Sequence, residues 1–147
     1  RLFGESFASF RSRSTGGYDR IVSNPPYFVR SLPCPDGART AARHTASLGY
    51  EELLDGARTL LSEQGVLSVI LPYEAEKPFS LAALCVGLYR SRTLYVCSVP
   101  GAEPKRVCME FRFGESEPAT ASLTLLGEDR AASGEYRALA GDFYQRM

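Results

Sequence analysis

The chain has 147 residues, 44% of them hydrophobic and 23% charged, which is enough to build one globular domain with a buried core. Its 17 basic and 17 acidic residues give a formal net charge of zero, so bulk electrostatics do not argue for a nucleic-acid-binding protein. The sequence has no apolar run of membrane-spanning length and no signal peptide at its start, which predicts a cytoplasmic protein with no membrane partner.

The cysteines do not form a metal-binding pattern. Cys34, Cys85, Cys97 and Cys108 are widely spaced, without a C-x-x-C pair, and a single histidine accompanies them. We therefore expect no metal site. We interpret the four residues as reduced thiols, with the last three buried in apolar segments.

The first residues read as the middle of a fold. Leu2 to Phe7 is typical of the end of a strand and its exit loop. This pattern predicts that the chain starts partway through a domain, so that residues 1–147 form one partial domain.

A short strand is predicted at Tyr18–Ser23, followed at once by the tetrapeptide Asn24-Pro25-Pro26-Tyr27. The two prolines end the strand because neither can donate to a sheet ladder and each fixes its own φ. The chain is left rigid at the carboxyl end of a strand, which is where open α/β sheets place their ligands.

The tetrapeptide suits a planar amino group. The Asn24 side-chain oxygen and the Pro25 carbonyl can accept hydrogen bonds from the two N–H groups of an exocyclic amine. These hydrogen bonds orient the amine nitrogen toward an electrophile. Tyr27 can stack on the ring that carries the amine, a contact worth roughly 1–3 kcal/mol. The simpler alternative is a turn that happens to precede an aromatic residue.

The next elements alternate between helix and strand. A long polar loop occupies Phe28 to Ala46, and a helix with Ser47 as its N-cap runs from there to Gly65. The nearly continuous apolar run Val66–Pro72 predicts a parallel strand that is covered on both faces. A second helix is predicted over Pro78 to Arg90.

The rest of the chain is predicted to be mainly β. Arg92 to Val99 and Lys105 to Phe113 read as an antiparallel pair, and Ser122 to Leu126 as a further short strand. A last helix begins near Gly134, and we expect its apolar stripe to pack in the core. The fold class is therefore α/β: the second half of a doubly wound, Rossmann-like sheet that ends in an antiparallel pair. A G-x-G-x-x-G turn is absent from the sequence.

Asn24-Pro25-Pro26-Tyr27 resembles the signature of amino-methyltransferases that use S-adenosylmethionine, which act on adenine, cytosine or glutamine side-chain amides. Further segments are similar to the bacterial valine-tRNA adenine-N(6)-methyltransferases. These segments are Arg39–His44, Leu60–Gly65, Val69–Pro72, Glu135–Arg137 and Asp142–Tyr144. The resemblance covers nearly all of this chain but only the C-terminal part of such an enzyme.

The resemblance implies a role for each residue of the tetrapeptide. Asn24 and Pro25 would hold the adenine amino group, Pro26 would stiffen the loop, and Tyr27 would stack on the extruded base. Extrusion costs less in an anticodon loop than in a duplex.

It also implies a cofactor, S-adenosylmethionine, whose adenosyl ring would meet the segment Glu5-Ser6-Phe7. The glycine-rich half of the cofactor site would precede residue 1. We therefore expect the chain alone to be inactive, and we expect the sheet edge exposed by truncation to favour self-association.

Four residues are candidates for contact with tRNA: Arg43, His44, Lys105 and Arg106. The alternatives are that the first two order the long loop and cap the next helix, and that the last two lie on a solvated hairpin end.

Two other functions stay open. One is a protein glutamine methyltransferase that acts on release factors, and the other is a non-catalytic binding module that has lost the cofactor half.

Overall fold

A mixed sheet organises the computed structural model, which describes residues 2–25 and 49–144. Its five strands lie in the order β1-β2-β4-β3-β5. Their bounds are Tyr18–Ser23 for β1, Leu61–Pro72 for β2, Tyr89–Cys97 for β3, Pro104–Arg112 for β4 and Ala119–Thr124 for β5.

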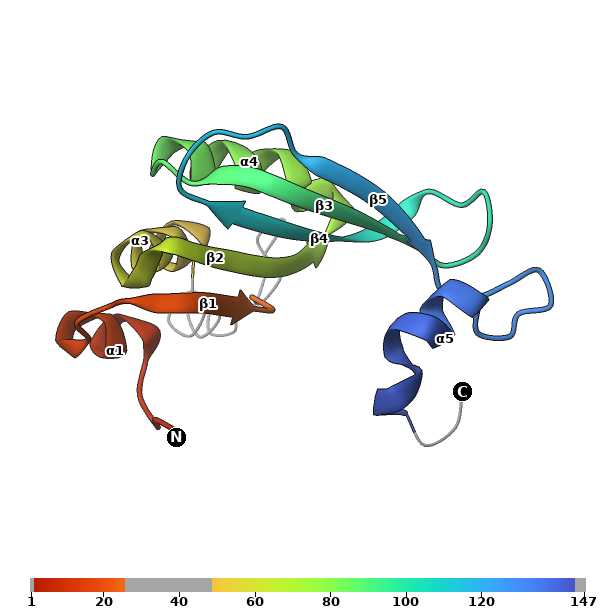
Figure 1. Ribbon diagram of the computed structural model, residues 1–147, viewed down its shortest axis with the longest axis horizontal. Helices are drawn as coiled ribbons and strands as arrows, with labels where there is room; N and C mark the ends of the chain where they lie inside the picture. The colour runs from red at the N-terminus through yellow and green to blue at the C-terminus, as the bar shows by residue number, and fades with distance from the viewer. Residues whose placement is uncertain (1, 26–48, 145–147) are drawn as a thin grey trace, which may run out of the picture.

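One strand runs against the others. β1 pairs with β2 in parallel, β4 is antiparallel to both β2 and β3, and β5 is parallel to β3. The arrowhead of β4 accordingly points opposite to those of β1 and β2 (Figure 1). The carboxyl ends of β1, β2, β3 and β5 therefore meet at one edge of the sheet, called here the carboxyl edge.

The predicted α/β fold class and the antiparallel pair are confirmed. The further short strand, β5, pairs in parallel with the outer side of β3. Sequence alone could not show this, since strand order depends on contacts between distant segments.

Two helices, α3 (Tyr50–Leu60) and α4 (Glu76–Cys85), pack on one face of the sheet (Figure 1). Another helix, α1 (Phe7–Arg13), lies beside α3, where the Phe7 ring packs against the core. Helix α5 (Gly134–Ala140) follows β5, and two short 3₁₀ turns complete the chain: η1 (Tyr73–Ala75) and η2 (Gly141–Phe143).

The core lies between the sheet and these helices. Phe79 of α4 is fully buried, and its ring centroid lies 5.0 Å from that of Tyr50 and 5.5 Å from that of Phe111. Alternate residues of β2 point into the same layer: Leu67, Val69 and Leu71.

The opposite face of the sheet is open in the part of the chain that the structure describes. Val22 of β1 is 79% exposed, and Ser68 and Ile70 of β2 are only partly buried. Among the described residues only the helix-side face of β2 is covered, and cover of its other face stays a prediction. The residues facing away from the helices are apolar enough to be covered, yet nothing among the described residues covers them.

Helix α3 ends at Leu60 instead of Gly65, because Leu61–Gly65 already belongs to β2. Tyr18 of β1 pairs with Leu61, but Arg20 pairs with Val66, so the extra residues of β2 bulge out of register. Gly65 lies inside this bulge, close to the backbone of β1.

Substituting Gly65 by alanine is expected to destabilise the fold. The new Cβ would lie 2.7 Å from the Tyr18 carbonyl oxygen and 2.9 Å from a Leu61 methyl carbon. Overpacking of this kind costs about 1–3 kcal/mol of unfolding free energy. Urea denaturation of Gly65→Ala measures the loss. Gly4→Ala is the control, since no atom lies within 4 Å of its new Cβ. Equal stability of the two variants would contradict this account.

Helix α4 ends at Cys85, five residues before the predicted end at Arg90. The backbone turns at Gly87, whose φ is +78°, and the Leu88 amide donates to the Ala83 carbonyl at 2.9 Å. This glycine-based helix end releases Tyr89 and Arg90 into β3. Cys85 is exposed at that end, so its predicted burial is wrong, and Cys97 and Cys108 are only partly buried.

The ends of the chain also differ from prediction. Ser6 accepts a hydrogen bond from the Ser9 amide at 3.2 Å, which caps α1, and residues 2–6 contain no strand. The apolar stripe of the last helix lies outside the core, since Leu139 is 61% and Phe143 85% exposed.

Candidate functional site

Asn24 and Pro25 lie at the carboxyl edge, directly after the last rung of β1, where Ser23 pairs with Val69. Side chains alternate along a strand, so Val22 and Asn24 face the open side of the sheet. Asn24 is exposed, while Pro25 is fully buried. The buried ring anchors the backbone immediately after an exposed amide, which limits how far that amide can move.

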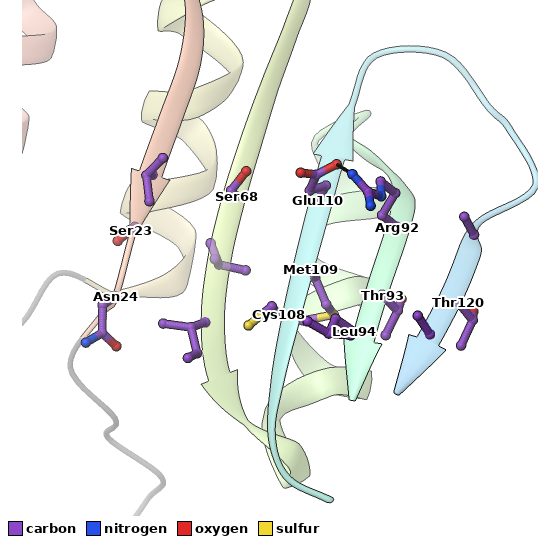
Figure 2. A pocket seen from close by; sticks show the side chains of 15 residues that line it. Ser23, Asn24, Ser68, Arg92, Thr93, Leu94, Cys108, Met109, Glu110 and Thr120 are labelled. Carbon is purple, nitrogen blue, oxygen red and sulfur yellow. Dashed lines mark ion pairs between the residues drawn. The ribbon is translucent and has the colours of Figure 1, made fainter. Parts of the chain in front are cut away.

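A concavity of about 400 Å³ begins at Asn24 and crosses the open face of the sheet (Figure 2). Its floor consists of two rungs. One rung runs Val22, Ser68, Glu110, Arg92 and Ala119, and the next runs Ile70, Cys108, Leu94 and Ala121. The floor is mostly apolar, with the amide of Asn24 at one end.

The ionisable groups of this concavity among the described residues are either paired with an opposite charge or uncharged. Arg92 and Glu110 form an ion pair of 3.7 Å across two strands (Figure 2). Arg92 is largely exposed, so such a pair contributes no more than about 1 kcal/mol. Burial raises the pKa of the Cys108 thiol, which therefore stays protonated at neutral pH. The concavity is built to bind an apolar surface rather than to transfer protons.

The segment Glu5-Ser6-Phe7 lies elsewhere, in a second concavity of about 410 Å³ beside β1. Its walls include the rings of Phe3, Phe10 and Tyr18, and it shares no lining residue with the first concavity. The structure therefore does not bring the predicted cofactor segment together with Asn24 in one pocket.

Each residue of that segment also has a structural role. The Arg13 guanidinium binds the Glu5 carboxylate, with Nε at 3.0 Å, and holds the pKa of this carboxyl below its ordinary value. Ser6 caps α1, and the Phe7 ring packs against Gly56. The cofactor role of these residues stays a prediction.

Lys105 and Arg106 begin β4 and are exposed. Arg106 pairs with Pro72, the last residue of β2, so both basic residues lie at the carboxyl edge with Asn24. Four other predicted site residues fall outside the described residues: Pro26, Tyr27, Arg43 and His44.

A buried polar network near this edge was missed by the sequence analysis. Glu76, the first residue of α4, is 9% exposed and accepts hydrogen bonds from Arg90 at 2.6 Å and from the Tyr95 hydroxyl at 2.9 Å. Burial, and then the bond to Glu76, raise the pKa of Tyr95. One sign of this network in the sequence is a glutamate, Glu76, close to the start of the predicted helix. Arg90 was predicted to lie in that helix, whereas it lies in β3.

No group of three or more histidine, cysteine, aspartate and glutamate side chains in the described ranges is arranged to hold a metal ion. None of the described helices combines the length and the apolar character that crossing a membrane requires.

The fold matches that of a solved structure. A solved structure described as a predicted O-methyltransferase from Agrobacterium tumefaciens superposes with a TM-score of 0.59 over 84% of this chain and 51% of that chain, at 17% identity. At this identity the match establishes the fold alone. The chain therefore has a Rossmann-like methyltransferase fold.

No family model matches the chain. Curated proteins with similar sequences indicate its class more closely than the fold does. A protein of Bacteroides fragilis is 45% identical over 130 residues, 88% of this chain and 55% of the relative. One of Parabacteroides distasonis is 41% identical over 148 residues, 100% of this chain and 62% of the relative. One of Actinobacillus succinogenes is 35% identical over 145 residues, 99% of this chain and 60% of the relative.

All three relatives are named tRNA1(Val) (adenine(37)-N6)-methyltransferase. The chain is a homologue of these tRNA methyltransferases, and it spans 55–62% of their length.

Proposed function

We propose that this chain forms the acceptor side of an enzyme that transfers a methyl group from S-adenosylmethionine to the N6 amino group of adenine 37 in a tRNA. The observation that carries the proposal is the position of Asn24 and Pro25, exposed amide and buried ring, at the carboxyl edge of a methyltransferase sheet. The names of relatives at 35–45% identity support adenine in tRNA as the acceptor.

The chain's own residues would orient the amine. The Asn24 oxygen and the Pro25 carbonyl each accept a hydrogen bond from one of its two N–H groups. The nitrogen electron pair therefore points at the incoming methyl carbon. S-adenosylmethionine supplies that methyl on a positively charged sulfur. When bound, it would let the new N–C bond form as its own C–S bond breaks, with the electron pair of that bond left on sulfur. The amine loses one proton to solvent afterwards, which is why no general base is needed beforehand.

The remaining predicted site residues have supporting roles in this proposal. Pro26 stiffens the loop and Tyr27 stacks on the extruded adenine. Glu5, Ser6 and Phe7 would face the adenosyl ring, and the aromatic second concavity beside β1 supports this role because a flat ring can stack there. The candidate contacts to tRNA are Arg43, His44, Lys105 and Arg106.

The open sheet face also supports self-association. In the described residues β1 has a strand neighbour on one side only, and the exposed Val22 lies beside that edge. A second copy can pair with such an edge or cover the apolar face. We place the enzyme in the cytoplasm, where its tRNA substrate resides.

The acceptor is tested by methyl transfer with the protein expressed from its complete reading frame. Labelled S-adenosylmethionine is offered with tRNA or with a release factor. We expect label in tRNA only. Label in the release factor only would establish a glutamine methyltransferase instead, and no label in either would favour a non-catalytic binding module.

The chain by itself is expected to bind S-adenosylmethionine weakly or not at all. Its described residues provide the acceptor side and one aromatic concavity, but they do not include the glycine-rich loop that the resemblance implies for the cofactor. Isothermal titration calorimetry of the 147-residue chain measures this affinity. A micromolar dissociation constant would contradict the proposed division of the site.

A further inference from the structure

Tyr73 is an exposed aromatic residue at the carboxyl edge that the proposed mechanism does not use. It opens η1, directly after β2, and 42% of its surface is exposed. Its ring packs on the ring of Tyr95 with the centroids 5.8 Å apart and the planes at 75°. Tyr73 therefore presents part of an aromatic ring to solvent just after β2, the neighbour of the strand that Asn24 follows.

The buried network described above holds this ring in place. Tyr95 donates its hydroxyl proton to Glu76, and Glu76 is bound in turn by Arg90. An aromatic ring that is already fixed loses little conformational entropy when a ligand stacks on it. The arrangement is typical of a binding surface that is prepared before its ligand arrives.

Two basic residues lie at the same end of the sheet as this ring. Arg106 lies opposite Pro72, the residue before Tyr73, and Lys105 is one position nearer the start of β4. Because side chains alternate along a strand, Arg106 lies on the open face with Asn24, opposite to Val107 and Tyr95. Lys105 is the extra residue of β4 at the register shift between β3 and β4. Both basic residues are exposed. Positive charge therefore lies at the carboxyl edge, in the part of β4 that pairs with the residue before Tyr73.

We propose that Tyr73, Lys105 and Arg106 form a subsite for an unpaired RNA nucleotide that neighbours the methylated one. The ring of Tyr73 stacks on its base, and the two basic side chains meet the adjoining phosphates. Exposed aromatic rings between cations are the usual means of holding single-stranded RNA without reading its sequence. This inference rests on the proposed function, since it assumes that the acceptor is RNA.

A tryptophan reporter tests the subsite directly, because the chain contains no tryptophan. In Tyr73→Trp the indole is the only such fluorophore, and a base stacked on it should quench its emission. Tyr18→Trp is the matched control. Tyr18 is 41% exposed, almost the same as Tyr73. It begins β1, so it lies at the end of the strands away from the carboxyl edge. The probe is a synthetic valine-tRNA anticodon stem-loop, whose binding is followed independently by anisotropy of an end label.

We expect quenching in Tyr73→Trp and none in Tyr18→Trp. Tyr73→Ala should bind the stem-loop about 5- to 150-fold more weakly, the range implied by the loss of one stacked base. Tyr73→Phe should keep the affinity, because its ring can still stack.

Two results would overturn the subsite. One is saturated anisotropy without quenching at position 73, and the other is no binding of the stem-loop at all. Neither touches the proposed function, which is tested by methyl transfer to tRNA. If methyl transfer fails while quenching is observed, the subsite stands as an RNA-binding surface and the proposed catalysis falls.

Discussion

Replacing Asn24 by alanine is expected to lower the turnover of methyl transfer to tRNA by about 10²- to 10³-fold, the usual effect of removing one preorganised hydrogen-bonding group from a reacting centre. Asn24 is exposed and follows the last rung of β1, so its side chain carries little of the folding energy. The loss should therefore appear in kcat, with an unchanged melting temperature.

The control for Asn24→Ala is Gln64→Ala. Gln64 is also an exposed amide, but it lies near the amino end of β2, away from the carboxyl edge. Both variants are assayed in the protein expressed from the complete reading frame. Full activity in Asn24→Ala would show that the amide does not orient the amine, and an equal loss in Gln64→Ala would show that the effect is not local.

The largest expected effect on stability comes from Phe79→Ala. Phe79 is fully buried and touches aromatic rings from both α3 and β4. Truncating such a side chain costs about 3–5 kcal/mol of unfolding free energy, because it removes apolar burial and leaves a cavity. A marginally stable domain has little more than this in reserve.

The same substitution at Phe143 provides the control. Phe143 is 85% exposed in η2, so Phe143→Ala should change the unfolding free energy by less than about 0.5 kcal/mol. Urea denaturation of both variants makes the comparison. A similar loss in the two would mean that η2 is packed in solution, contrary to the structure.

The sequence predicted the parts of the fold that depend on local chemistry. Tyr18–Ser23 forms a strand as expected, because β-branched residues are followed by two prolines that stop the ladder. The antiparallel pairing of β3 with β4 follows from the short turn between them. The tetrapeptide proposed to hold the acceptor could be singled out for the same reason, since its residues are consecutive.

The errors came from contacts between distant segments. The apolar run of β2 reads the same whether one face of the sheet or both are covered, and the described residues cover one. The stripe of the last helix has the pattern of a core helix, yet Leu139 is 61% exposed in the described part of the chain. The Glu76, Arg90 and Tyr95 network joins residues up to 19 positions apart, which no local pattern reveals.

The most direct test of the central claim is the identity of the methylated nucleoside. tRNA treated with the complete protein and S-adenosylmethionine is digested to nucleosides and analysed by mass spectrometry against authentic standards. Our account predicts N6-methyladenosine from the position next to the anticodon, and its loss in Asn24→Ala. Methylation of a ring nitrogen or a ribose hydroxyl instead would contradict it. Neither group has the two N–H donors whose hydrogen bonds Asn24 and Pro25 are proposed to accept.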